Sequence, residues 1–223
     1  MKNINIFFEK KPLKMICLGF SSGLPILLVF STLSVWLVKA GISRSTVTLF
    51  SWAGFAYAFK YLWSPLVDNY KLPIFKKFGH RRSWLLFSQF LIIIALILTA
   101  FTDPKESLFF TALFITILAF FSATQDILID AFRIESAPQS LQGPLSSMYI
   151  AGYRVAMLVA GAGSLWLASF FGTEIYDQNV WKKVYLIMSL FMFIGVFATF
   201  ISDEPKLKRN LNSDNHVKFL ITI

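Results

Sequence analysis

Residues 108–133 read LFFTALFITILAFFSATQDILIDAFR, an apolar run that ends in charged residues. The part up to Ala123 is too rich in Phe, Leu and Ile for the surface helix of a soluble protein. Asp126 and Asp130 are four residues apart, so they share one face of a helix, and Arg133 continues that face. An ionised carboxylate in the middle of a bilayer costs about 2.5–3.5 kcal/mol on insertion scales, so it usually faces a protein interior or a wet cavity. The stretch therefore predicts a membrane protein that handles polar or charged cargo.

The composition of the whole chain also favours a membrane protein. Of its 223 residues, 56% are hydrophobic and only 15% are charged, against roughly 25% charged in an average globular chain. The net charge of +9 comes from basic residues interspersed with apolar segments, so we expect no nucleic-acid partner. The single cysteine, Cys17, excludes an intrachain disulfide and a cysteine-based metal site. We expect no metal and no cofactor.

Six segments are long and apolar enough to cross a bilayer, so we predict an all-α, polytopic membrane protein. The six-helix transmembrane domain covers residues 15–201, between a cytoplasmic N-terminal segment, residues 1–14, and a cytoplasmic tail, residues 202–223. The breaks between the segments hold ordinary helix-capping and turn residues. The predicted spans are residues 15–38, 46–66, 84–102, 107–130, 145–171 and 183–201.

The lysine and arginine residues predict the orientation of these spans. With the N-terminus inside, 14 of the 21 basic residues fall in cytoplasmic segments and five fall outside. Cytoplasmic loops carry the excess of basic residues, so both termini are predicted in the cytoplasm. The remaining two, Lys60 and Arg154, lie inside predicted spans.

The two acids of the fourth span are predicted to differ in role. Asp126 lies deeper and is the candidate for binding and releasing a proton, because burial disfavours the charged form of a carboxylate. Asp130 is predicted to be structural, closing a salt bridge with Arg133, Arg81 or Arg82 at the cytoplasmic end.

Arg154 lies about ten residues into the fifth span, roughly 15 Å along the helix from its start. It is the expected basic neighbour of the acids, in a buried pair with Asp126 or Asp130. The alternative is an anchor for an anionic group on the cargo, because the guanidinium fork suits a carboxylate or phosphate. Lys60, near the end of the second span, is expected to snorkel or to form a structural ion pair, with a cargo contact as the alternative.

The sequence GFSSG, residues 19–23, formally matches the G-x-S-x-G nucleophile elbow. That elbow needs a strand before it, a helix after it and a histidine partner. His80 and His216 are both predicted in cytoplasmic segments, remote from Ser21. We therefore expect that the chain is not an enzyme. The small residues are predicted to permit close helix packing, and the serines could also line a cavity.

The connection after the second span reads SPLVDNY, residues 64–70, and then FGHRRSW, residues 78–84. An acid that closes a span, followed by glycine and a basic cluster before the next span, resembles the loop signature of the major facilitator superfamily. Three further motifs resemble AmpG-type muropeptide permeases, and the similarity runs from about residue 13 to residue 201. They are WSPLVD at 63–68, SATQDI at 122–127 with Asp130-Ala131, and GYR at 152–154 with MLV at 157–159.

The resemblance implies the N-terminal six-helix domain of the major facilitator fold, in the bacterial inner membrane. It implies proton-linked import of anhydromuropeptides for cell-wall recycling and β-lactamase induction, with protons, a glycopeptide cargo and the lipid bilayer as partners. We assign Asp126, Arg154, Lys60 and Gln125 to the pathway of substrate and proton. We assign a cytoplasmic charge network to Asp68, Arg81, Arg82, Asp130 and Arg133. Asn69 and His80 depart from the family, which usually has basic residues there.

Two alternatives stay open. Related acetyl-coenzyme A transporters share parts of the pattern, so the cargo could resemble acetyl-CoA. Such permeases also have at least twelve spans in two halves, with cargo at the interface of the halves. Six spans therefore need a second six-helix half, from another chain or by homodimerisation. Otherwise the chain is a truncated or split-gene fragment without transport activity.

Overall fold

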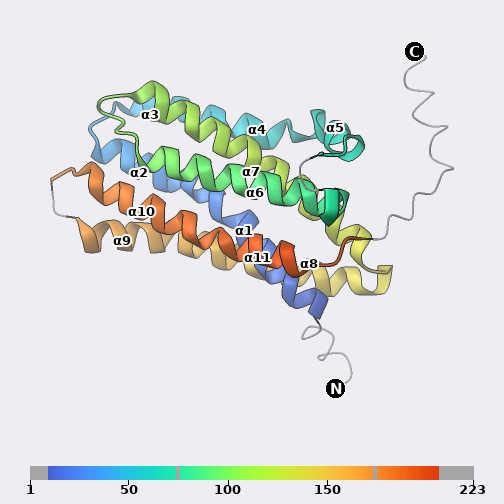
Figure 1. Cartoon of the computed structure of the whole chain (residues 1–223). Coiled ribbons are helices and arrows are strands. Elements are labelled where there is room, and N and C mark those ends of the chain that lie inside the picture. The colour runs from blue at the N-terminus through green and yellow to red at the C-terminus, as the bar shows by residue number, and fades with distance from the viewer. Residues whose placement is uncertain (1–9, 74–75, 173–174, 206–223) are drawn as a thin grey trace, which may run out of the picture.

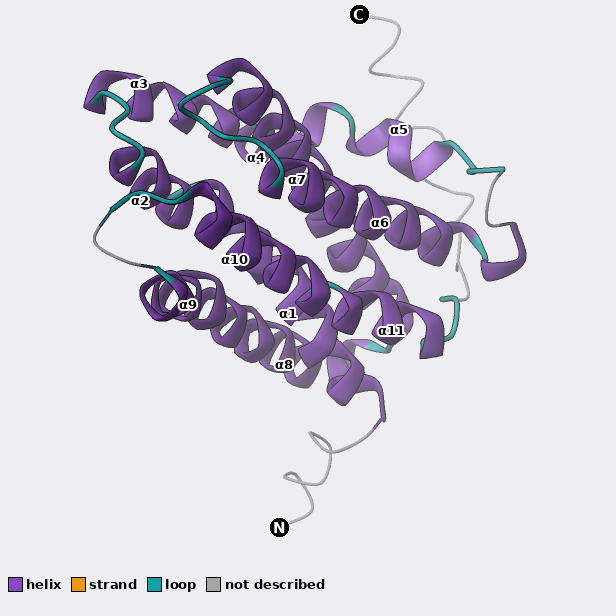
Figure 2. Ribbon diagram, turned by 60° about the vertical axis from the view of Figure 1, so that its left-hand side comes forward, coloured by secondary structure: helices purple, strands orange, loops and turns teal. Residues whose placement is uncertain are grey.

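The structure is a computed structural model that describes residues 10–73, 76–172 and 175–205. Every regular element among these residues is a helix (Figure 1), and short loops join the helices into one bundle (Figure 2). The predicted all-α class is confirmed.

Five of the six predicted spans are helices long and apolar enough to cross a membrane. The third and fourth are single helices, whereas the first, fifth and sixth each consist of consecutive helical pieces. They are α1 (Lys10–Val29) with α2 (Ser31–Lys39), α6 (His80–Ala100), α7 (Leu108–Ser136), α8 (Gln139–Leu158) with the π-helical turn Val159–Gly163 and α9 (Ser164–Phe171), and α10 (Gln178–Phe191) with α11 (Phe193–Ile201).

The predicted second span, residues 46–66, differs because it is broken into short helical pieces that run along α7. Pro65 explains the last break. It has no N–H to bond the carbonyl of Tyr61, and its ring crowds that carbonyl. The pieces are α3 (Arg44–Leu49), η2 (Phe50–Ala53), α4 (Gly54–Ala58), η3 (Lys60–Leu62) and α5 (Ser64–Asn69). A further short turn, η4 (Lys76–Phe78), precedes α6.

The first and last described helices give the two ends of the helical bundle. The first helix begins at Lys10, five residues before the predicted start, and α11 ends at Ile201, the predicted end. Residues 1–9 and 206–223 lie outside the described residues. They make up most of the two cytoplasmic segments, which therefore stay predictions.

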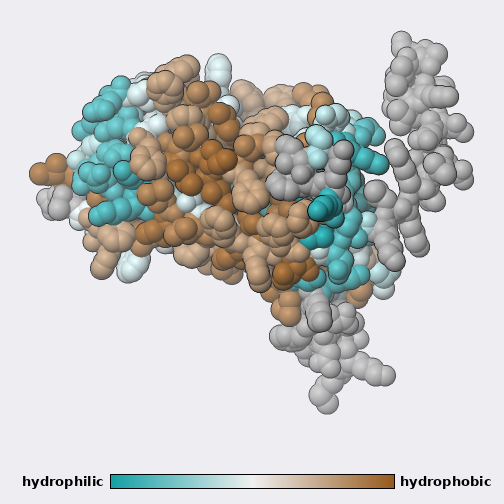
Figure 3. All heavy atoms as spheres, viewed as in Figure 1, coloured by the Kyte–Doolittle hydropathy of each residue, from teal (hydrophilic) through white to brown (hydrophobic). Residues whose placement is uncertain are grey.

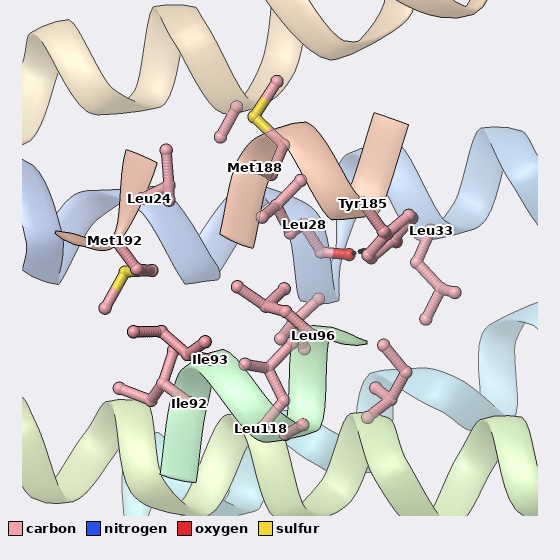
Figure 4. Close-up of a cluster of buried hydrophobic side chains, with 14 of the residues drawn as sticks. Leu24, Leu28, Leu33, Ile92, Ile93, Leu96, Leu118, Tyr185, Met188 and Met192 are labelled. Atoms are coloured by element: carbon pink, nitrogen blue, oxygen red, sulfur yellow. Dashed lines mark hydrogen bonds between the residues drawn. The ribbon is translucent and has the colours of Figure 1, made fainter. Parts of the chain in front are cut away.

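Helix α1 lies at the centre of the bundle and contacts α7, α8 and α11 (Figure 1). Its contact with α8 is close because glycines face backbone atoms: a Cβ added at Gly19 would overlap the carbonyl of Tyr149, and one at Gly152 would overlap the carbonyl of Ile16. Figure 4 shows the largest core cluster, where side chains from α1, α2, α6, α7 and α10 meet. The hydroxyl of Tyr185 is satisfied there, because it donates to the carbonyl of Leu28 at 2.9 Å.

Both ends of the described chain lie at the same end of the bundle (Figure 1). Cationic side chains donate hydrogen bonds to carbonyls at helix ends. Lys11 donates to the carbonyl of Ser136 at 2.8 Å, and Lys14 donates to the carbonyl of Ile201 at 2.6 Å. Arg82 donates to two further carbonyls of α11, those of Thr199 and Phe200. The last carbonyls of a helix have no partner within it, so these cations satisfy them and match the helix dipole.

The outer surface carries a broad apolar region between two polar ends (Figure 3). Many large apolar side chains of the described residues are exposed, including Phe109 at 72% and Phe170 at 69%. A soluble monomer rarely exposes apolar surface on this scale. This surface is that of a protein embedded in a membrane.

Candidate functional site

Asp126 lies inside the bundle, on the face of α7 that meets α1. It is only 8% exposed. The hydroxyl of Ser22, on α1, donates a hydrogen bond to its Oδ1 atom. The Ser22 hydroxyl also lies 2.8 Å from the hydroxyl of Tyr149, on α8. Asp126 is thus connected to two neighbouring spans.

The cation beside Asp126 is Lys60. Its Nζ atom lies 3.8 Å from Oδ2 of Asp126, and 34% of its side chain is exposed. Lys60 belongs to η3 in the broken second span, so four spans converge on the carboxylate. A buried charge is tolerated when it is paired and hydrogen-bonded, and both conditions are met here.

Arg154 does not take the place expected for it beside the acids. The structure gives Asp126 the partner Lys60 and gives Asp130 the partner Arg133, so the predicted buried pair with Arg154 is wrong. The reason is helical phase. Gly152 faces α1, and two residues further along an α-helix the side chain has turned by about 200°. Arg154 is therefore on the exposed side of α8.

Gln125 faces a different part of the interior from Asp126. Its amide nitrogen lies 3.5 Å from the hydroxyl of Ser21, and its amide oxygen is buried without a hydrogen-bond partner. A second glutamine, Gln89, accepts a hydrogen bond from Thr199 at 3.1 Å nearby. Adjacent residues of α7 thus face two polar clusters, with Asp126 in the cluster that reaches the second and fifth spans.

Four of the five residues assigned to the charge network lie in two separate ion-pair clusters. In the first, Arg81 lies 2.5 Å from Asp68 and 2.6 Å from Glu135, joining the second, third and fourth spans. In the second, Arg133 lies 3.5 Å from Asp130. Arg133 also donates to the hydroxyl of Ser146 at 2.7 Å, which joins α7 to α8.

Arg82 belongs to neither ion-pair cluster, since it donates to carbonyls at the end of α11 as described above. The backbone N–H groups of Arg81 and Arg82 donate to Glu204, at 2.8 and 3.1 Å. Glu204 thereby caps the first turn of α6, where a negative charge is favourable. The start of α6 and the end of α11 therefore cap each other.

Several residues of these clusters were not expected from the sequence. Glu135 and Glu204 lie near helix ends. Acidic residues are common at such positions, so their presence in the sequence does not indicate a special role. Ser22 stood out only as one of several serines, and Tyr149 carried no signal except its position one turn before Tyr153. A tyrosine at a close helix contact could have been singled out, because a buried hydroxyl needs a partner.

The nucleophile elbow is not formed. Ser21 lies within the continuous helix α1, and its hydroxyl donates to the carbonyl of Leu18 at 2.9 Å. A sharp strand-to-helix turn is required for that chemistry. In the part of the chain that the structure describes, no group of three His, Cys, Asp or Glu side chains could hold a metal ion.

Comparison with known proteins agrees with the motif resemblance. The family model of the Major Facilitator Superfamily matches residues 8–222. The chain is 35% identical to "Putative transporter AmpG 4" of Rickettsia felis over 98% of its own length and 51% of the relative. It is 36% identical to the "Anhydromuropeptide permease" of Escherichia coli over 91% of its own length and 39% of the relative. The chain thus spans about half the length of the curated relatives it matches.

Proposed function

The chain belongs to the major facilitator superfamily, and on that premise we propose that it works as the N-terminal half of a proton-linked importer of anhydromuropeptides. The observation that carries the proposal is Asp126, a buried acid paired with Lys60 where four spans converge. The name of the Escherichia coli relative supports the cargo. We place the chain in the bacterial inner membrane with both termini in the cytoplasm.

A switch of partners at Lys60 would couple proton and cargo. With Asp126 ionised, the carboxylate holds the ammonium group of Lys60 at 3.8 Å. A proton on Asp126 removes that attraction and frees Lys60 for an anionic group of the cargo. Arg154, exposed on α8, offers a second cation whose planar fork suits a carboxylate. Loss of the proton in the cytoplasm restores the ion pair and expels the anion.

The remaining assigned residues support this site. Gln125 is proposed to take part through the neighbouring polar cluster, where its buried amide oxygen has no hydrogen-bond partner. We propose that Asp68, Arg81, Arg82, Asp130 and Arg133 hold the cytoplasmic ends of the spans in register. The family and the permease name of the Escherichia coli relative support a transporter rather than an enzyme.

A second six-helix half would complete the site. Only 22% of the apolar window of the fifth span is buried, against 50–67% for the other four continuous spans. Leu158 and Trp166, exposed by 68% and 64%, mark this open surface. In transporters built from two halves, cargo binds between them near the middle of the membrane. A separate chain or a second copy of this one could supply that half.

Uptake in a permease-deficient host tests the proposal. The chain is expressed alone and with a separately encoded C-terminal half, and accumulation of labelled anhydromuropeptide is measured with and without an inward proton gradient. Gradient-dependent accumulation is expected in at least one arrangement. Stable insertion without uptake in both would contradict the proposal and favour the fragment alternative. Inhibition of this uptake by unlabelled acetyl-CoA at lower concentrations than by unlabelled anhydromuropeptide would reassign the cargo.

A further inference from the structure

Behind the ion pair of Asp126 and Lys60, two hydroxyl groups form a short chain that reaches α8. The Ser22 hydroxyl contacts Asp126 on one side and lies 2.8 Å from the Tyr149 hydroxyl on the other. We propose that Tyr149 is a positioning residue that sets the proton affinity of Asp126 by acting through Ser22. The inference rests on the proposed role of Asp126 in binding protons.

Counting hydrogens gives the direction of this chain. Ser22 has one hydroxyl hydrogen, and it donates that hydrogen to Asp126. Its contact with Tyr149 must then be one in which Ser22 accepts and Tyr149 donates. Hydrogen bonds in a series polarise one another, so the phenol strengthens the bond from Ser22 to the carboxylate. This order suits the ionised state, because a protonated carboxyl group has less need of a donor.

The backbone around this chain leaves it little freedom to rearrange. A Cβ added at Gly19 would overlap the carbonyl of Tyr149, and one at Gly23 would overlap the carbonyl of Tyr153, so α1 and α8 are in contact on both sides of Ser22. Ser22 itself is only 1% exposed. A change in charge at Asp126 therefore acts through Ser22 on the Tyr149 hydroxyl of α8, the helix that carries Arg154.

Other groups also act on Asp126 by their charge or dipole. Lys60 of the second span and Asp130, one turn further along α7, are charged groups within reach of it. Tyr57 on α4 and Tyr153 on α8 also lie within its electrostatic reach. The Tyr153 ring is 6.0 Å from that of Tyr149. The hydroxyl of Ser22, however, contacts Tyr149 and not Tyr153. Tyr153 is therefore a matched control: a neighbouring tyrosine outside the chain of hydroxyl groups.

Infrared titration of the chain in lipid nanodiscs tests the inference without any need for transport. The carbonyl band of protonated Asp126 is the one lost in Asp126→Asn. Tyr149→Phe keeps the ring but removes the donor. It should move the titration midpoint of the band upward by about 0.4–1 pH unit, the equivalent of one hydrogen bond. Tyr153→Phe should leave the midpoint within about 0.2 pH unit of the parent.

A double variant separates positioning from a general effect on packing. If Tyr149 acts through Ser22, then Tyr149→Phe produces no further shift in a Ser22→Ala chain. A shift that persists in that background, or equal shifts from Tyr149→Phe and Tyr153→Phe, would overturn the inference. If the Asp126 band does not titrate between about pH 4 and pH 9, the proposed proton role fails as well. If the band titrates in this range but its midpoint does not change in Tyr149→Phe, only the inference about Tyr149 is contradicted.

Discussion

At the scale of single residues, Asp126 shows how the interior of a membrane domain holds a charge. An unpaired carboxylate in the hydrocarbon region would cost several kcal/mol. Here Lys60 supplies an opposite charge and Ser22 supplies a hydrogen bond. Removing one member of such a buried set is costly, because it leaves the others without a partner. The site can therefore change charge only if its partners change together.

Replacing Asp126 by asparagine should abolish accumulation driven by a pH gradient while the chain still inserts. Asparagine keeps the size and can still accept from Ser22, but it cannot take up a proton. Uptake with and without a gradient, normalised to the amount of inserted protein, checks this. If the variant lowers only the protein level and not the uptake per molecule, then Asp126 is structural.

Arg154 should tolerate lysine poorly if it anchors an anion. Lysine keeps the charge but loses the planar pair of donors. We expect Arg154→Lys to raise the apparent KM for cargo about tenfold, the equivalent of one charge-assisted hydrogen bond. Arg154→Ala should have the larger effect. Concentration dependence of uptake measures both, and an unchanged KM in Arg154→Lys would argue against bidentate recognition.

At the scale of helices, close contacts and end caps fix how the spans meet. Small residues allow α1 and α8 to touch through their backbones, as is common between membrane helices. The start of α6 and the end of α11 exchange caps through Glu204 and Arg82. Helix α8 thus has a fixed contact with α1 while its other face stays open.

The contact of α1 and α8 should be sensitive to a single methyl group. Gly152→Ala places a Cβ against the carbonyl of Ile16, where backbone cannot give way easily. Overpacking of this kind costs about 1–3 kcal/mol, so the melting temperature in detergent should fall. Gly163→Ala is the control, because its nearest neighbours lie at 3.8 and 4.0 Å. Equal melting temperatures for the two variants would show that the contact is not tight.

At the scale of the whole molecule, the fold was predictable and the pairing at the site was not. Long apolar segments and the loop after Asp68 predicted the helices and their family. The partner of Asp126 depends on the helical phase of a broken span, and Lys60 is 66 residues away along the chain. Short helical pieces change that phase in a way that hydrophobic periodicity cannot show. Arg154 failed as the expected partner for a different reason, because it lies two residues after Gly152 in the continuous helix α8 and is therefore on the exposed side.

From the exposed surface of the fifth span we predict where the second six-helix half binds. Leu158→Trp puts a bulky side chain on the surface proposed to meet the second half. We expect it to reduce co-purification with a C-terminal half at least tenfold, since a mismatched interface costs more than about 1.4 kcal/mol. Phe197→Trp is the control, because Phe197 is 66% exposed on a different span, α11. Undiminished co-purification of Leu158→Trp would place the second half elsewhere.

The basic residues that close helix ends have a consequence for how the protein is made. In the proposed orientation, Lys11, Lys14 and Arg82 belong to the cytoplasmic excess that guides insertion. They also satisfy the last carbonyls of α7 and α11 in the finished bundle. Neutralising one of them would weaken a topogenic signal during synthesis and leave an unpaired carbonyl afterwards. Biogenesis and folded stability thus depend on the same side chains.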